Sequence, residues 1–307
     1  MPELSVILIN YKRVRDTIEC IESLQKSTYT SFEIIVVDNA SRDGSVETLR
    51  STFPAIHVLE CEENLGFAEG NNIAMRKALA SGSRFILLLN NDTIVHRHAL
   101  SELVSTMHNH PEAGIVGAKI YYADRPNVLW YAGGYFNEHS SFGGHYGMGE
   151  PDTGQYDTER TCSLITGCCL LIRREVCEKV GLLDSDYFAY LEDADYCTRV
   201  RRGGYALYYQ PKAIIHHKIS STSAWDSPVY IYFNLRNKIL FLRKNARLLH
   251  VLPHVPRLLY FYLRQFVRLL FKWHSLKKTR AAWFGLIDGF RTYTGQFGRG
   301  RLDHLGK

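Results

Sequence analysis

The chain has 307 residues, of which 46% are hydrophobic and 22% are charged, and its formal net charge is +6 at pH 7. This length and composition suffice for a full hydrophobic core, so they exclude a disordered segment and predict one large domain or a domain with an appendage. The seven cysteines contain no C-x-x-C pair, which argues against a disulfide framework or a zinc ribbon.

Apolar runs along the chain are short. No N-terminal stretch has the pattern of a signal peptide, and no run reaches the roughly 20 residues of a membrane-spanning helix, so we expect a cytoplasmic protein. The charges are unevenly distributed, because residues 1–226 carry 21 basic and 29 acidic side chains whereas residues 227–287 carry twelve basic and no acidic ones. We expect a body over residues 1–225 and a basic helical region over residues 226–307.

Four apolar segments alternate with helix-like stretches in the first 110 residues. They are 4–10 (LSVILIN), 33–38 (EIIVVD), 56–60 (IHVLE) and 85–89 (FILLL), and each precedes a stretch with helical character. Runs that are apolar on both faces are typical of parallel strands covered by helices on both sides. The sequence therefore predicts an α/β fold with a mostly parallel sheet flanked by helices.

Polar side chains follow three of these strands where each strand ends. Right-handed crossovers place the carboxyl ends of parallel strands along one edge of the sheet, where ligands bind. The residues expected to converge there are Asn10, Tyr11, Asp38, Asn39, Asn90, Asn91 and Asp92. The alternative role is capping of the next helix, which we favour for Ser41 and Asp43.

The second half of the body is less regular. Residues 122–160 are rich in glycine, tyrosine and polar side chains, which predicts long loops or an irregular hairpin over the sheet edge. The segment 161–176 (TCSLITGCCLLIRREV) indicates an apolar strand that leads into a helix.

Three carboxylates, Glu192, Asp193 and Asp195, open a predicted helix that ends in arginines and two glycines (YLEDADYCTRVRRGGY). The helix dipole alone explains much of this charge order. The aromatic residues and the leucine just before the carboxylates suggest a partly buried helix start that faces the cleft. A carboxylate there has a raised pKa and is a candidate general base.

His216 and His217 follow a further apolar stretch (PKAIIHHK). A single histidine is more often structural than a ligand. A divalent ion held by Asp92 and by substrate phosphates would nevertheless accept an imidazole as a further ligand, so both roles stay open.

Residues 256–273 (PRLLYFYLRQFVRLLFKW) predict an amphipathic helix, because the basic residues fall in one sector and most apolar ones fall opposite. Such a helix can pack on the body or lie on an anionic membrane surface. The absence of acidic residues across 227–287 favours the membrane. Nucleic acid is a poorer partner because the acidic body repels phosphates.

Several segments together resemble the family 2 inverting glycosyltransferases with the GT-A fold, and more narrowly the branch that includes bacterial rhamnosyltransferases. They are SVILINYKR, EIIVVDNASRDGS, ENLGFAEGNNIA, LLLNNDTIV and the region from ITGCCLLIRREV through the acidic helix to AIIHHKISSTS, with YFNLRNKILFLRKN as a weaker match. Together they span most of residues 4–245.

The resemblance implies that residues 1–120 bind the nucleotide and that residues 121–225 hold the acceptor and the catalytic base. Asp38 would contact the base or ribose, with the backbone near Asn10 and Tyr11 lining the same pocket. The residues implied to lie beside it are Asn64, Gly66 and Asn71. Gly66 would be required because the turn needs an unhindered backbone.

The resemblance also places Asn90 and Asp92 at the outer positions of the family's D-x-D motif. Asp92 would then bind the Mg²⁺ or Mn²⁺ ion that bridges the donor's diphosphate. Because Asn90 is neutral, metal affinity in the absence of the donor should be low. His217 aligns with a late histidine near the diphosphate, and His216 is the alternative one residue away.

Asp193 is the best match to the family's catalytic base, with Glu192 beside it and Asp195 as second choice. The implied reaction is a single displacement with inversion, from a dTDP-, UDP- or GDP-linked sugar such as rhamnose to a saccharide acceptor. A lipid-linked acceptor in bacterial surface polysaccharide assembly would suit a peripheral enzyme on the inner face of the cell membrane.

Two other classes share parts of this pattern. A nicotinamide-dependent oxidoreductase shares the strand and helix alternation, but the turn after LSVILIN reads YKRVRD and lacks G-x-G-x-x-G. A catalytically silent binding protein of the same fold is the closer rival, because Asn90 departs from the D-x-D motif.

Overall fold

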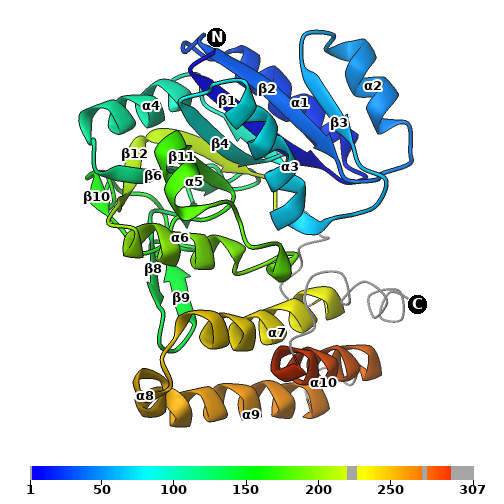
Figure 1. Cartoon of the computed structure of the whole chain (residues 1–307), viewed down its shortest axis with the longest axis vertical. Coiled ribbons are helices and arrows are strands. Elements are labelled where there is room, and N and C mark those ends of the chain that lie inside the picture. The colour runs from blue at the N-terminus through cyan, green and yellow to red at the C-terminus, as the bar shows by residue number, and fades with distance from the viewer. Residues whose placement is uncertain (1, 220–226, 272–274, 292–307) are drawn as a thin grey trace.

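The computed structural model describes residues 2–219, 227–271 and 275–291 (Figure 1). A ten-stranded sheet has the order β10-β12-β6-β11-β4-β1-β2-β3, with β5 paired to β12 and β7 to β6. Its strands are β1 (Leu4–Asn10), β2 (Phe32–Asp38), β3 (His57–Glu60), β4 (Phe85–Asn90), β5 (Thr93–Val95), β6 (Ala113–Tyr122), β7 (Leu129–Tyr131), β10 (Arg160–Thr161), β11 (Cys169–Arg173) and β12 (Ala206–His217).

A separate two-stranded hairpin is formed by β8 (Gly134–Asn137) and β9 (Phe142–His145). The helices of the body are α1 (Val14–Gln25), α2 (Ser45–Thr52), α3 (Gly66–Ala80), α4 (Ala99–Asn109), α5 (Arg174–Val180), the 3-10 turn η1 (Ser185–Tyr187) and α6 (Glu192–Arg202). The C-terminal helices are α7 (Pro228–Asn245), α8 (Leu248–Val251), the 3-10 turn η3 (Leu252–His254), α9 (Val255–Phe271) and α10 (Leu276–Arg291).

The predicted mostly parallel sheet is confirmed. Strand β1 runs parallel to β2 and β4, β2 runs parallel to β3, and β6 runs parallel to β12, whereas β11 lies antiparallel between β4 and β6. Within β1, Val6 and Leu8 pack with α1 and α4 on one face, and Ile7 packs with α3 and α6 on the other. Because helices cover both faces, the strands are apolar without alternation.

The irregular second half contains the predicted hairpin as β8 and β9. In the segment 161–176 the strand is confined to Cys169–Arg173, and helix α5 follows at Arg174. Of the preceding residues, Thr161 ends β10 and pairs with Tyr208 of β12, whereas the backbone groups of the residues after it bond to separate elements. Cys162 N donates to Leu207 O, and Asn90 N donates to Cys168 O.

The C-terminal helices stack against the body below α6 in the view of Figure 1. Helix α7 buries most of its length, and α10 lies against it, where the Tyr232 hydroxyl donates to Asp288 Oδ2 at 2.9 Å. The predicted amphipathic helix is present as α9, although Lys272 and Trp273 lie outside the described residues. Over the part of the chain that the structure describes, no helix combines the length and the apolar character needed to cross a bilayer.

Candidate active site

The ends of β1 and β2 are joined by a buried hydrogen-bond network. Asn10 Nδ2 donates to Asp38 Oδ2 at 2.6 Å, and the backbone N–H of Ser41 donates to Asp38 Oδ1 at 2.8 Å. The side-chain oxygen Asn10 Oδ1 accepts from the Thr17 hydroxyl on α1 at 2.9 Å. Asn10 is fully buried and Asp38 is 1% exposed. The carboxylate is therefore fixed in one orientation at the carboxyl end of the sheet.

The turn that precedes α3 is built on Asn39, the residue after Asp38. The Asn39 side chain donates to Asn64 Oδ1 and to Gly66 O, both at 3.0 Å, and accepts from Leu65 N at 2.8 Å. Gly66 has a φ of +77°, and a Cβ atom there would lie 2.5 Å from the carbonyl oxygen of Phe188. This residue must be glycine both for its backbone conformation and for this close approach.

The two other residues that we expected near Asp38, Asn71 and Tyr11, differ in their exposure. The Asn71 side chain is buried within α3, where it donates to Phe67 O at 2.8 Å. Tyr11 lies just after β1 and is 43% exposed, with the Lys12 ammonium 5.3 Å from its ring centroid. Asn71 thus braces the first turn of α3, and Tyr11 is accessible at the rim.

The end of β4 brings the predicted D-x-D region into the same network. Asn91 Nδ2 donates to the Thr17 hydroxyl at 2.8 Å, so the β4 end and Asn10 share one partner. Asp92 Oδ1 lies 3.0 Å from His217 Nε2 at the end of β12. The backbone N–H of Lys218 donates to Asp92 O at 2.9 Å, which holds the two segments together.

The two adjacent histidines face opposite ways, as neighbouring strand residues do. His217 is 6% exposed, and its ring stands edge-on to Trp130 with centroids 4.7 Å apart. His216 instead stacks on Tyr121 at 5.5 Å, and burial lowers the pKa of His216. Of the pair, His217 is the one beside Asp92.

The donor atoms of Asp92 and His217 fit a divalent ion. Two ligand atoms at about 2.1 Å from one ion and at right angles to each other lie about 3.0 Å apart, which matches the observed 3.0 Å separation. His217 Nδ1 is buried and has no hydrogen-bond partner among the residues that the structure describes. Among the described residues no cluster of three or more His, Cys, Asp or Glu side chains is arranged to hold a metal, so further ligands would have to come from substrate and water.

Asp193 and Glu192 occupy the first turn of α6. Asp193 Oδ2 accepts from the backbone N–H of Gly167 at 2.9 Å, and Asp193 Oδ1 accepts from Ala194 N at 2.8 Å. Burial raises the pKa of Asp193, and these backbone donors counter part of that increase. Burial, followed by the charge of Asp193, raises the pKa of Glu192 well above its usual value. Glu192 Oε2 is buried without a partner.

Asp195 has different surroundings from these two carboxylates. Its Oδ2 atom pairs with Arg199 Nε at 2.7 Å, and its Oδ1 atom accepts from Asn245 Nδ2 at 2.8 Å and from the Tyr187 hydroxyl at 3.3 Å. Asp195 is 2% exposed. Its oxygens are engaged in joining α6 to α7 and to the segment before α6.

Some residues of this site were not singled out from the sequence. Thr17 connects Asn10 with Asn91, and residues 167–168 connect the two sides of the cleft, because Gly167 N binds Asp193 while Cys168 O accepts from Asn90 N at 2.9 Å. The segment ITGCCLLIRREV carried the family resemblance, but nothing in its local pattern indicates which backbone group meets Asp193.

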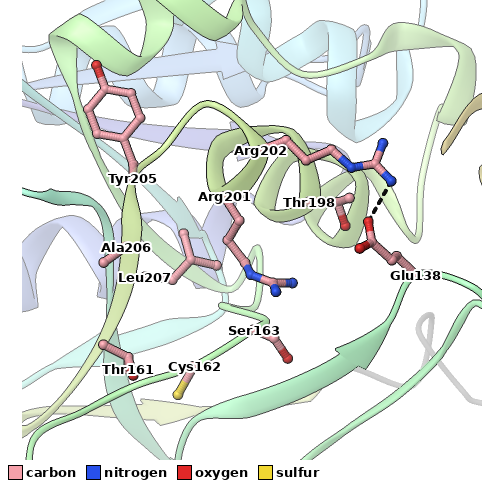
Figure 2. Close-up of a pocket in the computed structure, with 10 residues that line it drawn as sticks. All are labelled: Glu138, Thr161, Cys162, Ser163, Thr198, Arg201, Arg202, Tyr205, Ala206 and Leu207. Carbon is pink, nitrogen blue, oxygen red and sulfur yellow. Dashed lines mark hydrogen bonds and ion pairs between the residues drawn. The ribbon is translucent and has the colours of Figure 1, made fainter.

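A cavity of about 490 Å³ lies at the opposite end of α6 from Asp193. Figure 2 shows Arg201 reaching into it from α6, whereas Arg202 turns toward Glu138, with 2.6 Å between their charged atoms. None of the sequence-predicted site residues lines this cavity. The predicted cluster is instead an open edge formed by the ends of β1, β2, β4 and β12 and the start of α6.

Residues 5–181 match the model of the family described as "Glycosyl transferase family 2". The chain belongs to glycosyl transferase family 2. The matched range contains the Asp38 network, the Asn90–Asp92 turn and Gly167. The chain is therefore a glycosyltransferase and not an oxidoreductase, in agreement with the prediction from the motifs.

Curated relatives of this family 2 glycosyltransferase include a low-salt glycan biosynthesis hexosyltransferase, Agl10, of Haloferax volcanii, which is 26% identical over 96% of the chain and 94% of the relative. An N-acetylglucosaminyl-diphospho-decaprenol L-rhamnosyltransferase of Mycobacterium tuberculosis is also 26% identical, over 71% of the chain and 77% of the relative. The predicted similarity to rhamnosyltransferases is confirmed.

The solved structures support the fold. A mannosyltransferase from Pyrobaculum calidifontis, determined in complex with GDP-Man and Mn²⁺, superposes with a TM-score of 0.57 at 20% identity. The superposition covers 79% of this chain and 64% of that one. The predicted GT-A fold is thereby confirmed.

Proposed function

We propose that this glycosyltransferase inverts the sugar's anomeric configuration in a single displacement and that Asp193 is its general base. The acceptor hydroxyl oxygen forms a bond to the anomeric carbon while the bond from that carbon to the diphosphate oxygen breaks. Asp193 takes the hydroxyl proton, and the nucleoside diphosphate leaves with the bonding electron pair. The observation that carries this proposal is the backbone of residues 167–168, which joins Asp193 to Asn90 beside the Asp92–His217 pair.

Asp92 and His217 are the residues we propose to hold Mg²⁺ or Mn²⁺. When bound, the ion would neutralise charge on the donor's diphosphate and so favour its departure. Without the donor these two side chains are too few for tight binding, and the neutral Asn90 adds no charge. Metal binding should therefore depend on the donor.

The surroundings of the remaining residues favour a nucleotide contact for some of them and a structural role for others. The Asp38 carboxylate, positioned by Asn10 and Ser41, is our candidate for contact with the base or ribose, and Asn39, Asn64 and Gly66 shape the turn beside it. The pairing of Asp195 with Arg199 supports a structural role for that carboxylate. The stacking of His216 on Tyr121 likewise favours His217 as the metal ligand.

The relatives narrow the substrate classes. We infer a nucleotide-linked hexose donor, with rhamnose on dTDP first among the candidates and UDP- and GDP-linked sugars as alternatives. A sugar on a polyprenyl diphosphate is the acceptor class we favour, because the mycobacterial relative acts on such a lipid by its name. The activity would serve assembly of a cell-surface glycan.

The exposed part of the C-terminal helices supports membrane association. On α9 the apolar side chains Leu259 and Leu263 are both 65% exposed, and residues 227–287 contain twelve basic and no acidic side chains. Apolar side chains beside a cationic field match the surface of an anionic bilayer. We propose that this surface holds the enzyme on the inner face of the cell membrane, where a lipid-linked acceptor is available.

The decisive test compares the wild type with Asp193→Asn and Asp92→Ala. Release of UDP, dTDP or GDP is measured from UDP-glucose, dTDP-L-rhamnose or GDP-mannose, with farnesyl-diphospho-N-acetylglucosamine as acceptor. We expect Asp193→Asn to lower kcat by about 10² to 10⁴ while donor affinity persists, because a general base acts only in the chemical step. Asp92→Ala should abolish the Mn²⁺-dependent part of the thermal stabilisation by nucleoside diphosphate. Unchanged turnover in Asp193→Asn would rule out Asp193 as the base.

A further inference from the structure

The six residues before Asp193 have an unusual backbone. Phe188, Tyr190 and Leu191 all have positive φ values, of 62°, 69° and 66°. Each such conformation is strained for a residue with a side chain, relative to the ordinary backbone regions. A segment with three of them keeps this shape only if its surroundings hold it.

Among the contacts of helix α7 with this segment is one fully buried amide. Asn237 Nδ2 lies within hydrogen-bond distance of three carbonyl oxygens, at 3.0 Å from Tyr187, 2.8 Å from Ala189 and 2.7 Å from Tyr190. Asn237 has no exposed surface. One side chain therefore satisfies carbonyls on both sides of Phe188.

The neighbouring Arg236 determines which way the Asn237 amide faces. Arg236 Nη1 donates to Asn237 Oδ1 at 2.8 Å, and Arg236 Nη2 donates to Asp186 O at 2.8 Å. A guanidinium group can only donate, so the amide oxygen must face Arg236 and the NH₂ group must face the segment. Arg236 is 1% exposed, which strengthens these bonds.

The opposite side of the segment is held by α3. The carbonyl oxygen of Phe188 accepts from the backbone N–H groups of Phe67 at 2.6 Å and Ala68 at 3.3 Å. Residues 187–190 thus lie between the start of α3, which borders the Asp38 pocket, and the middle of α7. The chain leaves this segment directly into Glu192 and Asp193.

We propose that Asn237, oriented by Arg236, is a positioning residue that holds residues 187–191 in the shape that presents Asp193 to the acceptor hydroxyl. This inference rests on the proposed role of Asp193 as general base. The C-terminal helices then have two roles: α7 contributes to catalysis, and α9 contributes to the proposed membrane attachment. Asn237 acts only through Asp193 and does not touch substrate.

The test replaces Asn237 with Leu, which has a similar volume and no hydrogen-bonding groups. Asn234→Leu is the matched control, because Asn234 lies one turn earlier on α7 and, among the described residues, its side chain bonds within that helix, to the Tyr230 hydroxyl at 3.2 Å. Turnover is measured with whichever of dTDP-L-rhamnose, UDP-glucose or GDP-mannose the wild type consumes. We expect a loss in kcat of about 10- to 100-fold for Asn237→Leu, since displacements near 1 Å have such effects, and little loss for the control. The Kd of the matching nucleoside diphosphate should change less than about threefold, as a displaced base leaves donor binding intact.

Folding and catalysis are separated by normalising turnover to the fraction of protein that binds the nucleoside diphosphate. Asn237→Ser is a second, milder variant, since its hydroxyl keeps one donor. Combining Asn237→Leu with Asp193→Asn gives the readout that a merely structural residue would not change: in the Asp193→Asn background, Asn237→Leu should add almost no further loss of kcat. The proposal would be overturned if Asn237→Leu and the control Asn234→Leu had the same kcat. Fully additive losses in the Asn237→Leu, Asp193→Asn double variant would also overturn it. If Asp193→Asn alone keeps full activity, the proposed base is wrong. If Asp193→Asn loses activity but Asn237→Leu does not, only the positioning role is rejected.

Discussion

At the scale of single residues, the hydrogen-bond partners distinguish the three carboxylates at the start of α6. Asp195 has three partners, Asp193 has two backbone N–H donors, and Glu192 Oε2 has none. A buried acid without compensating donors is more stable in its protonated form, and so Glu192 keeps its proton well above its usual pKa of 4.5. At pH values between the unfolded-state and the folded-state pKa of Glu192, the folded protein therefore holds a proton that the unfolded chain has released.

This difference predicts a pH-dependent stability for Glu192→Gln. Because the folded-state pKa is the higher one, the wild type loses stability as pH rises above the unfolded-state pKa, and the neutral glutamine has no such loss. We expect the variant to unfold at a higher temperature than the wild type near pH 8, with the difference disappearing near about pH 4. Thermal unfolding at both pH values measures this, and Glu22→Gln on the exposed side of α1 is the control. A constant difference across this range would mean that Glu192 does not titrate in the way proposed.

At the scale of secondary-structure elements, the start of α3 joins the turn after β2 to the segment before α6. Asn39 holds the turn from one direction, and the Phe188 carbonyl accepts from the first N–H groups of the helix from the other. Only a residue without a Cβ atom permits this approach at Gly66. The two sides of the cleft are therefore coupled through backbone contacts.

Two glycines at the starts of helices provide a matched test of this coupling. Gly66 has a φ of +77° and would place a Cβ atom 2.5 Å from Phe188 O, whereas Gly44 has a φ of +82° and nothing within 4 Å. We expect Gly44→Ala to lower the free energy of unfolding by about 1 kcal/mol, from backbone strain alone. Gly66→Ala should lower it by roughly 2 kcal/mol more, because the backbone of residue 188 must move, and kcat should fall with it. Chemical denaturation and turnover measure the two effects, and equal losses for both variants would contradict the coupling.

At the scale of the whole molecule, the C-terminal helices pack against the body through α7 and carry the proposed membrane surface on α9. Tyr232, Phe233 and Phe241 of α7 are fully buried, and Gly285 of α10 packs against the backbone of Tyr232. Removing residues after 245 would uncover α7 and disturb the segment before Asp193. A truncated protein is thus unsuitable for testing membrane attachment, and surface substitutions are preferable.

We expect Leu259→Gln combined with Leu263→Gln to reduce binding to vesicles that contain phosphatidylglycerol. Each side chain loses apolar area that would enter the interface, at about 25 cal/mol per Å². Sedimentation with these vesicles, and with phosphatidylcholine vesicles for comparison, measures the bound fraction at low and high salt. Tyr135→Gln with Met148→Gln is the control, since those side chains are exposed outside the C-terminal helices. Membrane attachment through α9 is wrong if both double variants sediment like the wild type.

Local patterns were enough for the first four strands and for the kinds of chemistry, but they did not predict β6 (Ala113–Tyr122). The apolar runs of β1, β2 and β4 predicted a sheet covered on both faces. The polar residues after them predicted one ligand-binding edge. Both patterns are visible in consecutive residues of the chain. The motifs around Asp38, Asp92 and Asp193 predicted the family for the same reason. These features depend on residues close together in the chain.

Contacts between distant segments required the tertiary structure. His216 and His217 are equivalent by composition, and only the pairing of β12 with β5 and β6 places His217 beside Asp92. The sequence likewise could not separate the engaged Asp195 from Asp193, because the partner Asn245 lies 50 residues away. The contact of Asn237 with Tyr187 also spans 50 residues and follows no local period. The sequence by itself therefore determined the fold class and the chemistry, and long-range packing decided which of several similar side chains faces the cleft.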